Sequence, residues 1–359
     1  MMTTACQAPR VSVLMTMFNA GVYLRPAIES LLAQSYTDFE LIIVDDGSTD
    51  GSATVAEGFA DPRIRLIRNA SNSGLTKCLN QGLALARGEF VARQDADDLS
   101  ASDRLEKQTR LLDTHPEIAL LGSNAKQIDG NGQFLGHTDL PLDTPAIRWG
   151  NLFFNSFLHS AVMFRTKVVR EEFGGYDESF RCSMDYALWS RVAQRHAVTN
   201  LAESLISLRV HPESMTRSEP SVLETETDRV LRANMAAEFP ERGFSEEEIG
   251  ILVEYRRNLL PGTLPRFRAL FDELRAVFLR RHPEAEKSRQ FLRTESRQFS
   301  RIGYHLIDRN RSVAFAAFAH CIRLWPGAIV ELPWPRIIAL ALLGNSAREL
   351  YRRVFSSRE

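Results

Sequence analysis

Three carboxylates stand within four residues of this chain, at Asp95, Asp97 and Asp98. They follow the apolar run 90–92, where a buried strand would end. Carboxylates this close repel one another unless a cation or hydrogen bonds offset their charge. A hard divalent cation with oxygen ligands fits, because such an ion takes part of its shell from substrate phosphates. The stretch therefore indicates a metal–nucleotide site, although Asp also caps helices and residues 104–112 read as the next helix.

A second acidic pair, Asp45 and Asp46, follows another apolar run, residues 39–44. Apolar residues at nearly every position are typical of a parallel strand covered on both faces. Further strands are predicted at 11–15, 64–67 and 90–92, and helices at 24–32 and 75–83. This alternation predicts an α/β fold with a doubly wound, mostly parallel sheet flanked by helices, in which ligands bind outside the carboxyl ends of the strands. Both acidic groups then lie at one edge, which favours a site over two unrelated caps or turns.

Composition limits the class of protein. The chain has 359 residues, 44% hydrophobic and 25% charged, so it can bury the core of one large or two ordinary domains. A formal net charge of −1 gives no general attraction to nucleic acid, and no such partner is expected. Four scattered cysteines fit a reducing compartment and argue against a structural zinc site. We find no signal-peptide core and no apolar run of about 18 residues, so no spanning helix is expected.

The middle of the chain carries further polar signals. Residues 118–122 and 205–210 read as strands, and His211 follows the second of them. A turn within 126–137 is typical of a hairpin. A helix begins just before Asp185 and places this carboxylate at its cap or in its first turn.

Residues 218–359 are predicted to form a helical C-terminal region. Strand-like runs stop there, and residues 263–302 hold ten Lys and Arg against five Asp and Glu. The apolar stretches 313–322 and 336–343 are separated by Trp-Pro pairs. Helices of this kind fit an anionic membrane surface, packing on a catalytic core, or a homodimer contact.

The motifs together resemble the family 2 glycosyltransferases of the GT-A fold. Residues 11–19, 43–50 and 72–75 are similar to the nucleotide-binding half of that family, Asp95-Ala96-Asp97 to its DxD motif, and 174–177 and 184–189 to its acceptor-side motifs. The resemblance covers about residues 10–216. We therefore predict a flexible N-terminus at 1–9, a GT-A domain at 10–217 with a nucleotide-binding half at 10–100 and an acceptor half at 101–217, and the helical region at 218–359.

The resemblance also implies roles for single residues. Asp46 would accept a hydrogen bond from the base of the donor, which is preferred as UDP on resemblance alone. Asp95 would lie near the ribose or the water shell of the metal, Asp97 would bind Mn²⁺ or Mg²⁺ directly, and Asp185 would be the general base. The remaining donor contacts implied are Thr16, Phe18, Asn19, Asn72, Gly74 and Ala96.

Five residues fit either a site or a structural role. Lys77 and Arg93 would contact phosphate or ribose, or be solvated on the surface. His211 would complete the metal shell or be structural, and His159 would line the acceptor pocket or be a hydrogen-bonded core histidine. Met184 stands where the family often has Glu, so the base position is kept but its acidic neighbour on the acceptor side is missing.

The function predicted is an inverting, metal-dependent glycosyltransferase that moves a sugar from a nucleoside-diphosphate donor to a hydroxyl of a glycan or lipid-linked acceptor. The setting expected is cell-surface polysaccharide synthesis, in the cytoplasm or peripheral at the inner membrane surface. A sugar-1-phosphate nucleotidyltransferase is one alternative, but residues 16–21 hold one glycine and no basic residue to grip a triphosphate. A non-catalytic nucleotide-sugar-binding protein is the other, and the intact Asp97 and Asp185 argue against it.

Overall fold

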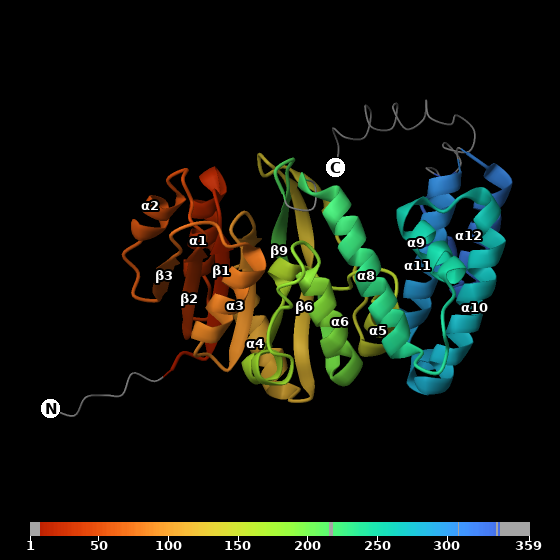
Figure 1. The fold of residues 1–359 in the computed structure, drawn as a ribbon, viewed down its shortest axis with the longest axis horizontal. Helices are drawn as coiled ribbons and strands as arrows, with labels where there is room; N and C mark the ends of the chain where they lie inside the picture. The colour runs from red at the N-terminus through yellow and green to blue at the C-terminus, as the bar shows by residue number, and fades with distance from the viewer. Residues whose placement is uncertain (1–7, 215–217, 308, 335–336, 338–359) are drawn as a thin grey trace. The chain divides into compact units, whose positions relative to one another are not determined.

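The computed structural model describes residues 8–214, 218–307, 309–334 and 337. The chain divides into two compact units, Met1–Leu140 with Phe157–Thr227, and Pro141–Ser156 with Asp228–Glu359. The first unit is built on a sheet with flanking helices, and the second is helical (Figure 1). Most of the predicted flexible segment 1–9 and of the apolar run 336–343 lies outside the described residues.

The first unit carries the predicted parallel strands. Within the described residues the sheet has the order β3-β2-β1-β4-β8-β6-β9-β5, and β7 pairs with β6. Its first four strands are parallel to one another. They are β1 (Val11–Met17), β2 (Phe39–Asp45), β3 (Ile64–Arg68) and β4 (Phe90–Asp95).

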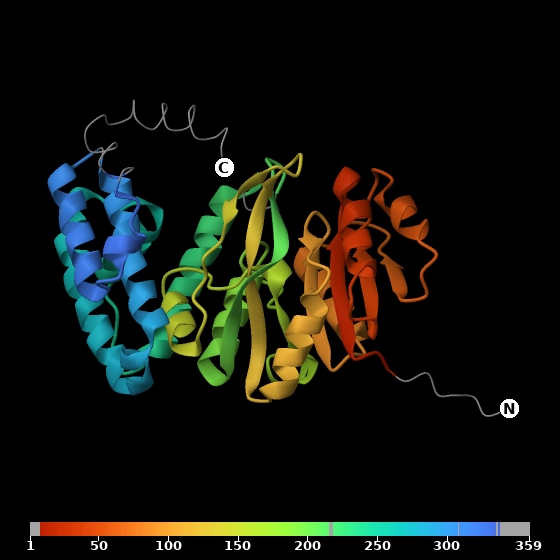
Figure 2. The ribbon, with the colours of Figure 1, turned by 180° about the vertical axis from the view of Figure 1, so that it is seen from behind.

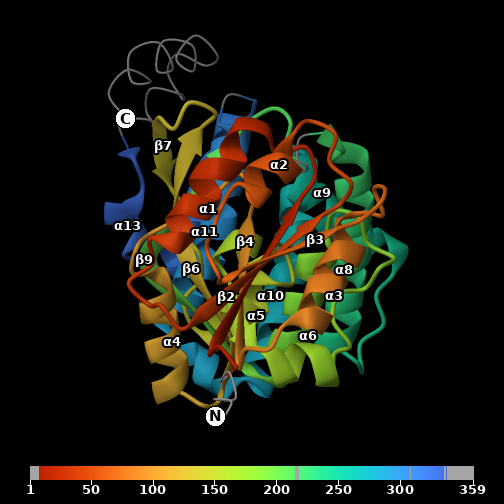
Figure 3. The same cartoon turned by 90° about the vertical axis from the view of Figure 1, so that its left-hand side faces the viewer.

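Helices on both faces explain why β1 and β2 are buried throughout. Val13 of β1 belongs to the apolar cluster that includes Ile28 of α1 (Leu24–Leu32). On the other face, Leu14 packs against α3 (Leu75–Leu85), so closely that a Cβ added to Gly82 would lie 2.1 Å from Leu14 Cδ1. Figure 3 shows α1 and α3 on opposite sides of these strands. Two-sided burial is thus the reason that the strands read as continuous apolar runs.

The second half of the sheet mixes directions. β6 (Ile118–Asp129) is antiparallel to β8 (Met163–Arg165) and parallel to β9 (Ala197–Val210), which lies beside it in Figure 2. Both long strands extend beyond the predicted 118–122 and 205–210. Polar and exposed positions such as Glu203 interrupt their apolar pattern, so the sequence predicts only part of each strand. The predicted hairpin pairs β6 with β7 (Phe134–His137).

The other elements of the first unit are short, apart from two helices. They are η1 (Gly21–Tyr23), α2 (Ser52–Glu57), β5 (Leu99–Ser100), α4 (Arg104–Thr114), η2 (His159–Ala161), η3 (Val168–Glu172) and α6 (Met184–Arg195).

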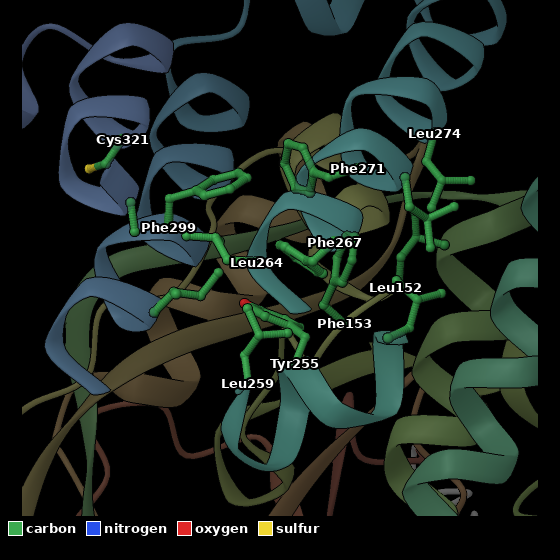
Figure 4. Packing of buried hydrophobic residues seen from close by; sticks show 14 of the residues in the cluster. Leu152, Phe153, Tyr255, Leu259, Leu264, Phe267, Phe271, Leu274, Phe299 and Cys321 are labelled. Carbon is green, nitrogen blue, oxygen red and sulfur yellow. The ribbon is translucent and has the colours of Figure 1, made fainter. Parts of the chain in front are cut away.

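The second unit has an aromatic core. The indole of Trp149 contacts the rings of Phe271, Phe278 and Phe291 edge-on, at centroid distances of 5.1 to 5.7 Å. Figure 4 shows part of the surrounding cluster, including Phe153 and Phe271. Its helices are α5 (Thr144–Gly150), α9 (Glu246–Asn258), α10 (Leu264–Arg281), α11 (Arg289–Leu306), α12 (Arg311–Leu324) and α13 (Ala328–Glu331), together with the part of α8 (Pro220–Glu238) after residue 227.

The compact units divide the chain differently from the predicted boundary after residue 217. The first unit extends to Thr227, and the segment 141–156, predicted as part of the acceptor half, belongs to the helical unit. The cause is Trp149 and its neighbour Phe153, whose side chains pack in the aromatic core of that unit. No helix among the described residues is long and apolar enough to cross a bilayer.

Candidate active site

The carboxyl ends of β2, β1 and β4 bring the predicted polar residues to one edge of the sheet. Thr16 of β1 is in register with Val44 of β2 on one side and with Asp95 of β4 on the other. Met17, the next residue, pairs with Asp45. Because these strands are parallel neighbours, both acidic groups lie at the same edge, as the sequence predicts.

Asp46 holds the loop that follows β3. Its Oδ1 accepts hydrogen bonds from the amide and the hydroxyl of Ser73, both at 2.8 Å, and its Oδ2 accepts from the amide of Gly74 at 2.8 Å. Burial raises the pKa of Asp46, but these donors outweigh it and hold the pKa below its ordinary value. Much of the accepting capacity of this carboxylate therefore serves the loop, which carries the exposed Asn72 and leads into α3, where Lys77 is exposed.

Two tight turns complete this side of the edge. Asn19 has a left-handed backbone (φ 51°), and its Oδ1 accepts a hydrogen bond from the amide of Thr49 at 2.8 Å. Gly47 also has a positive φ, of 77°, and a Cβ added there would lie 2.8 Å from the carbonyl carbon of Ser71. Beside Asn19, Phe18 is 49% exposed, so a ligand can reach this residue.

Arg93 is buried beneath the acidic cluster. Its guanidinium donates to Asp95 Oδ1 at 2.6 Å and to Thr16 Oγ1 at 3.1 Å, and none of the residue is exposed. This corrects the alternative of a solvated surface arginine and leaves no free surface for contact with a phosphate. Arg93 instead neutralises and orients Asp95, whose amide donates to Ser160 Oγ at 2.9 Å. Ala96, the next residue, is buried.

Asp97 and His211 form the polar centre of this edge. His211 Nε2 lies 2.9 Å from Asp97 Oδ2, although the two residues are 114 positions apart. Burial and the neighbouring Asp95 raise the pKa of Asp97, and its contact with His211 opposes that rise. A carboxylate and an imidazole that face each other in this way have the chemistry of metal ligands.

Arg209 fastens the acidic loop to β9. Its amide donates to Asp98 Oδ1 at 2.7 Å, and its Nε donates to the carbonyl of Asp97 at 2.9 Å. Its guanidinium also lies 4.6 Å from the ring centroid of Tyr23, a ring that contacts His211 as well. Sequence reasoning missed Arg209 and Tyr23. The available signal was the position of Arg209, two residues before His211 on a predicted strand.

One interpretation of the acidic cluster is a cap of the following helix. Asp98 does not have this role. The N-cap position of α4 is Asp103, and Asp98 is bound to the backbone of Arg209 instead. Burial and the charges of Asp95 and Asp97 hold the pKa of Asp98 well above its ordinary range. Asp98 is therefore a structural member of the cluster.

His159, one of the residues predicted for the acceptor side, lies beside Tyr176. His159 Nε2 lies 3.2 Å from the hydroxyl of Tyr176, and burial together with Arg93 lowers the pKa of His159 to about 3, so the imidazole is neutral. The pKa of Tyr176 is raised, chiefly by burial. Arg93 opposes this rise, and the charges of Asp185 and Asp95 add to it. Asp185 and the acidic edge are thus within electrostatic reach of the same hydroxyl.

Asp185 lies in the first turn of α6, which has Ser183 as its N-cap residue. Asp185 is partly exposed as a residue, whereas the adjacent Met184 is buried. An acceptor contact from Met184, like that of His159, stays a prediction.

The loop before α6 depends on glycine and on α3. Gly175 has a φ of 83°, and a Cβ added there would lie 2.7 Å from Asn80 Oδ1. That oxygen accepts the amide of Tyr176 at 2.9 Å, and the side-chain nitrogen of Asn80 donates to the Tyr176 carbonyl at 2.9 Å. Nothing in the sequence marks Asn80 for this role.

The residues at the acidic edge fit a divalent cation that is completed by substrate. No group of three or more His, Cys, Asp and Glu side chains within the described ranges forms a full metal site. Asp97 and His211 would supply one oxygen and one nitrogen, and the charge of Asp95 is near enough to raise the pKa of Asp97. Such a cation takes its other ligands from water and a diphosphate, as Mg²⁺ does in phosphate-binding sites.

Similarity to known proteins identifies the family of this chain. The sequence model of the family described as "Glycosyl transferase family 2" matches residues 12–173. The chain is 36% identical over 216 residues to the putative glycosyltransferase EpsE of Bacillus subtilis. The aligned region covers 58% of this chain and 76% of that protein. The chain belongs to glycosyltransferase family 2. An uncharacterized glycosyltransferase of Methanocaldococcus jannaschii is 32% identical over 209 residues, covering 56% of this chain and 71% of that protein.

Solved structures show the same GT-A fold. S. aureus TarS 1–349 in complex with UDP-GlcNAc matches with a TM-score of 0.56 at 17% identity, over 90% of this chain and 92% of that one. The mannosyltransferase PcManGT from Pyrobaculum calidifontis, in complex with GDP-Man and Mn²⁺, matches with a TM-score of 0.50 at 17% identity, over 89% and 88%. The predicted family, fold and enzyme class are confirmed. The chain is a glycosyltransferase rather than a sugar-1-phosphate nucleotidyltransferase.

Proposed function

We propose that this glycosyltransferase moves a sugar from a nucleoside-diphosphate sugar to a hydroxyl of a glycan or lipid-linked acceptor, with inversion at the anomeric carbon. The observation that carries the proposal is the pair Asp97–His211, 2.9 Å apart at the sheet edge, with Asp185 on a separate helix. Inversion requires a base on the face of the sugar opposite the leaving diphosphate. Two separate carboxylate positions suit that division of work.

Asp97 and His211 would hold Mn²⁺ or Mg²⁺. When bound, a divalent cation stabilises the negative charge that develops on the leaving diphosphate. Asp95, oriented by Arg93, would contact the ribose or a metal-bound water. Asn72, Lys77 and the exposed face of Phe18 would meet the rest of the donor. The two structural neighbours are complexes with UDP-GlcNAc and GDP-Man, which supports a nucleotide-sugar donor without selecting its base or its sugar.

Asp185 would accept the proton of the acceptor hydroxyl. The partly exposed position of Asp185 in the first turn of α6 supports this role, because an incoming hydroxyl has to reach the base. General base catalysis of this kind contributes about 10²- to 10⁴-fold to the rate. The neutral His159 and Tyr176 would line the same pocket as uncharged hydrogen-bonding groups.

The test is a donor screen that measures release of nucleoside diphosphate. UDP-GlcNAc, GDP-Man and related donors are offered with Mn²⁺ or Mg²⁺, with water and simple alkyl glycosides as acceptors. We expect release from the natural chain, and loss of release in Asp97→Ala and Asp185→Asn. Asp113→Ala serves as the control, because Asp113 is an exposed residue of α4 that pairs with Arg10. Full turnover by both active-site variants would overturn the proposal.

Synthesis of a cell-surface polysaccharide at the cytoplasmic face of a membrane is the setting we propose. Three apolar side chains of the helical unit support a surface contact, because Phe315, Ile329 and Val330 are exposed. Flotation with anionic liposomes tests this, with Ile329→Glu/Val330→Glu as the variant. A homodimer contact through the same helices would instead show as a change in mass by light scattering.

A further inference from the structure

Helix α6 begins at an unusual arrangement of backbone donors. The amides of three consecutive residues, Arg181, Cys182 and Ser183, all point at one carboxylate. That carboxylate belongs to Glu226 on α8, and the three N···O distances are 2.7, 2.8 and 2.8 Å. All four residues lie in the first compact unit.

Glu226 is 9% exposed, so its charge has lost most of its hydration. A buried carboxylate is unfavourable unless strong donors replace the water. Hydrogen bonds from backbone amides to a charged oxygen are about twice as strong as those between neutral groups. Three such bonds to successive residues fix the backbone of the segment, because each amide orientation depends on the dihedral angles on either side of it.

Two more contacts join the same segment to α8 and to Glu219, the residue before it. Ser183 Oγ lies 3.2 Å from Thr227 Oγ1, and the guanidinium of Arg181 donates to Glu219 Oε1 at 2.8 Å. Just before this segment, the carbonyl of Phe180 accepts a hydrogen bond from Thr76 Oγ1 of α3 at 2.6 Å. The approach to α6 is therefore held from two sides, and the contacts to Glu226 lie next to the helix.

Asp185 follows Ser183 by two residues and lies in the first turn of α6. Its position depends on where the helix starts and on the direction in which its first turn points. We infer that Glu226 is a positioning residue of the active site: its carboxylate fixes the backbone at 181–183 and so sets the place of Asp185. The inference rests on the proposed role of Asp185 as the base.

Glu226→Gln tests the inference with little change in shape. The amide replaces one accepting oxygen by a donor, so at least one backbone N–H of the segment loses its partner. Glu224→Gln is the matched control, because Glu224 is an exposed residue of the same helix. We expect amide exchange at residues 181–186 to become about ten- to hundredfold faster in Glu226→Gln and to stay unchanged in Glu224→Gln.

The rate of nucleoside-diphosphate release shows whether this anchor serves catalysis. Misplacing a catalytic group by about 1 Å costs up to roughly 10²-fold. In Glu226→Gln we expect kcat to fall about 10- to 100-fold, with KM for the donor within about twofold of the natural value. In an Asp185→Asn background the same change should have almost no further effect on kcat.

Three results would overturn the inference: unchanged exchange at 181–186, an unchanged kcat in Glu226→Gln, or an equal loss with and without Asp185. Failure of the proposed base is distinguishable from these. In that case Asp185→Asn alone would keep full turnover, while amide exchange would still report whether Glu226 holds the segment.

Discussion

The proposed donor side and the proposed base side of this active site are built in different ways. The donor side consists of the ends of adjacent parallel strands, and the register of β1, β2 and β4 alone brings Thr16, Asp45 and Asp95 together. The base side consists of one helix start, α6, whose approach is held by Asn80 on α3 and Glu226 on α8. Sheet register therefore positions the first side, and single long-range hydrogen bonds position the second.

This difference predicts that loss of a charged side chain impairs the donor side, whereas a change in the backbone impairs the base side. The largest effect is expected for Asp97→Ala. Removing the carboxylate that faces His211 would abolish metal-dependent binding of the diphosphate and cost about 10³-fold in turnover. Calorimetry of UDP and of GDP with Mn²⁺ measures the binding. Unchanged affinity in Asp97→Ala, equal to that of the Asp113→Ala control, would contradict the assignment.

Asp46→Asn should weaken the donor side through loss of a charged acceptor. The donors from Ser73 and Gly74 lower the pKa of Asp46, against burial, so ionisation stabilises the fold. This stabilisation is present above the ordinary pKa of 3.8 and is lost as the pH falls through the lower folded value. At pH 7 we expect a loss of about 1.5–3 kcal/mol in the free energy of unfolding.

Denaturation of Asp46→Asn and of the natural chain between pH 7 and pH 2.5 checks this prediction. The difference in unfolding free energy between them should shrink only below about pH 3.8. A difference that does not depend on pH would mean that the carboxylate acts by shape rather than by charge.

Arg209→Ala should weaken metal binding without removing a ligand. Arg209 holds the carbonyl of Asp97, so its loss frees the loop that carries the proposed metal ligand. Mutating residues that orient metal ligands costs about 10- to 100-fold in affinity, and we expect that range for Mn²⁺ binding in the presence of UDP. Arg65→Ala, on the outer strand β3, is the control. Equal affinities in the two variants would show that Asp97 needs no such support.

The smallest effect should come from paired glycine substitutions on the base side. Gly174→Ala and Gly175→Ala both place a side chain at positive φ, 72° and 83°, which costs about 1 kcal/mol or more in stability. Only at Gly175 would the new Cβ also meet Asn80 Oδ1, at 2.7 Å, while the space around Gly174 is open. Gly175→Ala should therefore also lower kcat, and Gly174→Ala should not. Thermal unfolding and turnover measured together decide this.

The same contrast explains which residues of the site could be predicted from the sequence. Asp95, Asp97 and Asp46 could be predicted because apolar runs end just before them and parallel strands end at one edge. The burial of Arg93 could not, since a charged residue on a strand next to carboxylates reads equally well as a surface group. Arg209, Asn80 and Glu226 act through contacts between elements distant in sequence, and no local spacing encodes such contacts. The position of Trp149 in the sequence falls within the predicted acceptor half, 101–217. Its packing against aromatic rings places it in the helical unit instead.

The central claim is that Asp97 and Asp185 do separate work in one site. The most direct measurement is the affinity of Asp185→Asn for UDP or GDP with Mn²⁺, taken beside its rate of nucleoside-diphosphate release. If Asp185 acts only as the base, the affinity stays within about twofold of that of the natural chain and the rate falls by about 10²- to 10⁴-fold. An Asp185→Asn variant that releases nucleoside diphosphate at the natural rate, or that loses nucleotide binding as Asp97→Ala does, would contradict it.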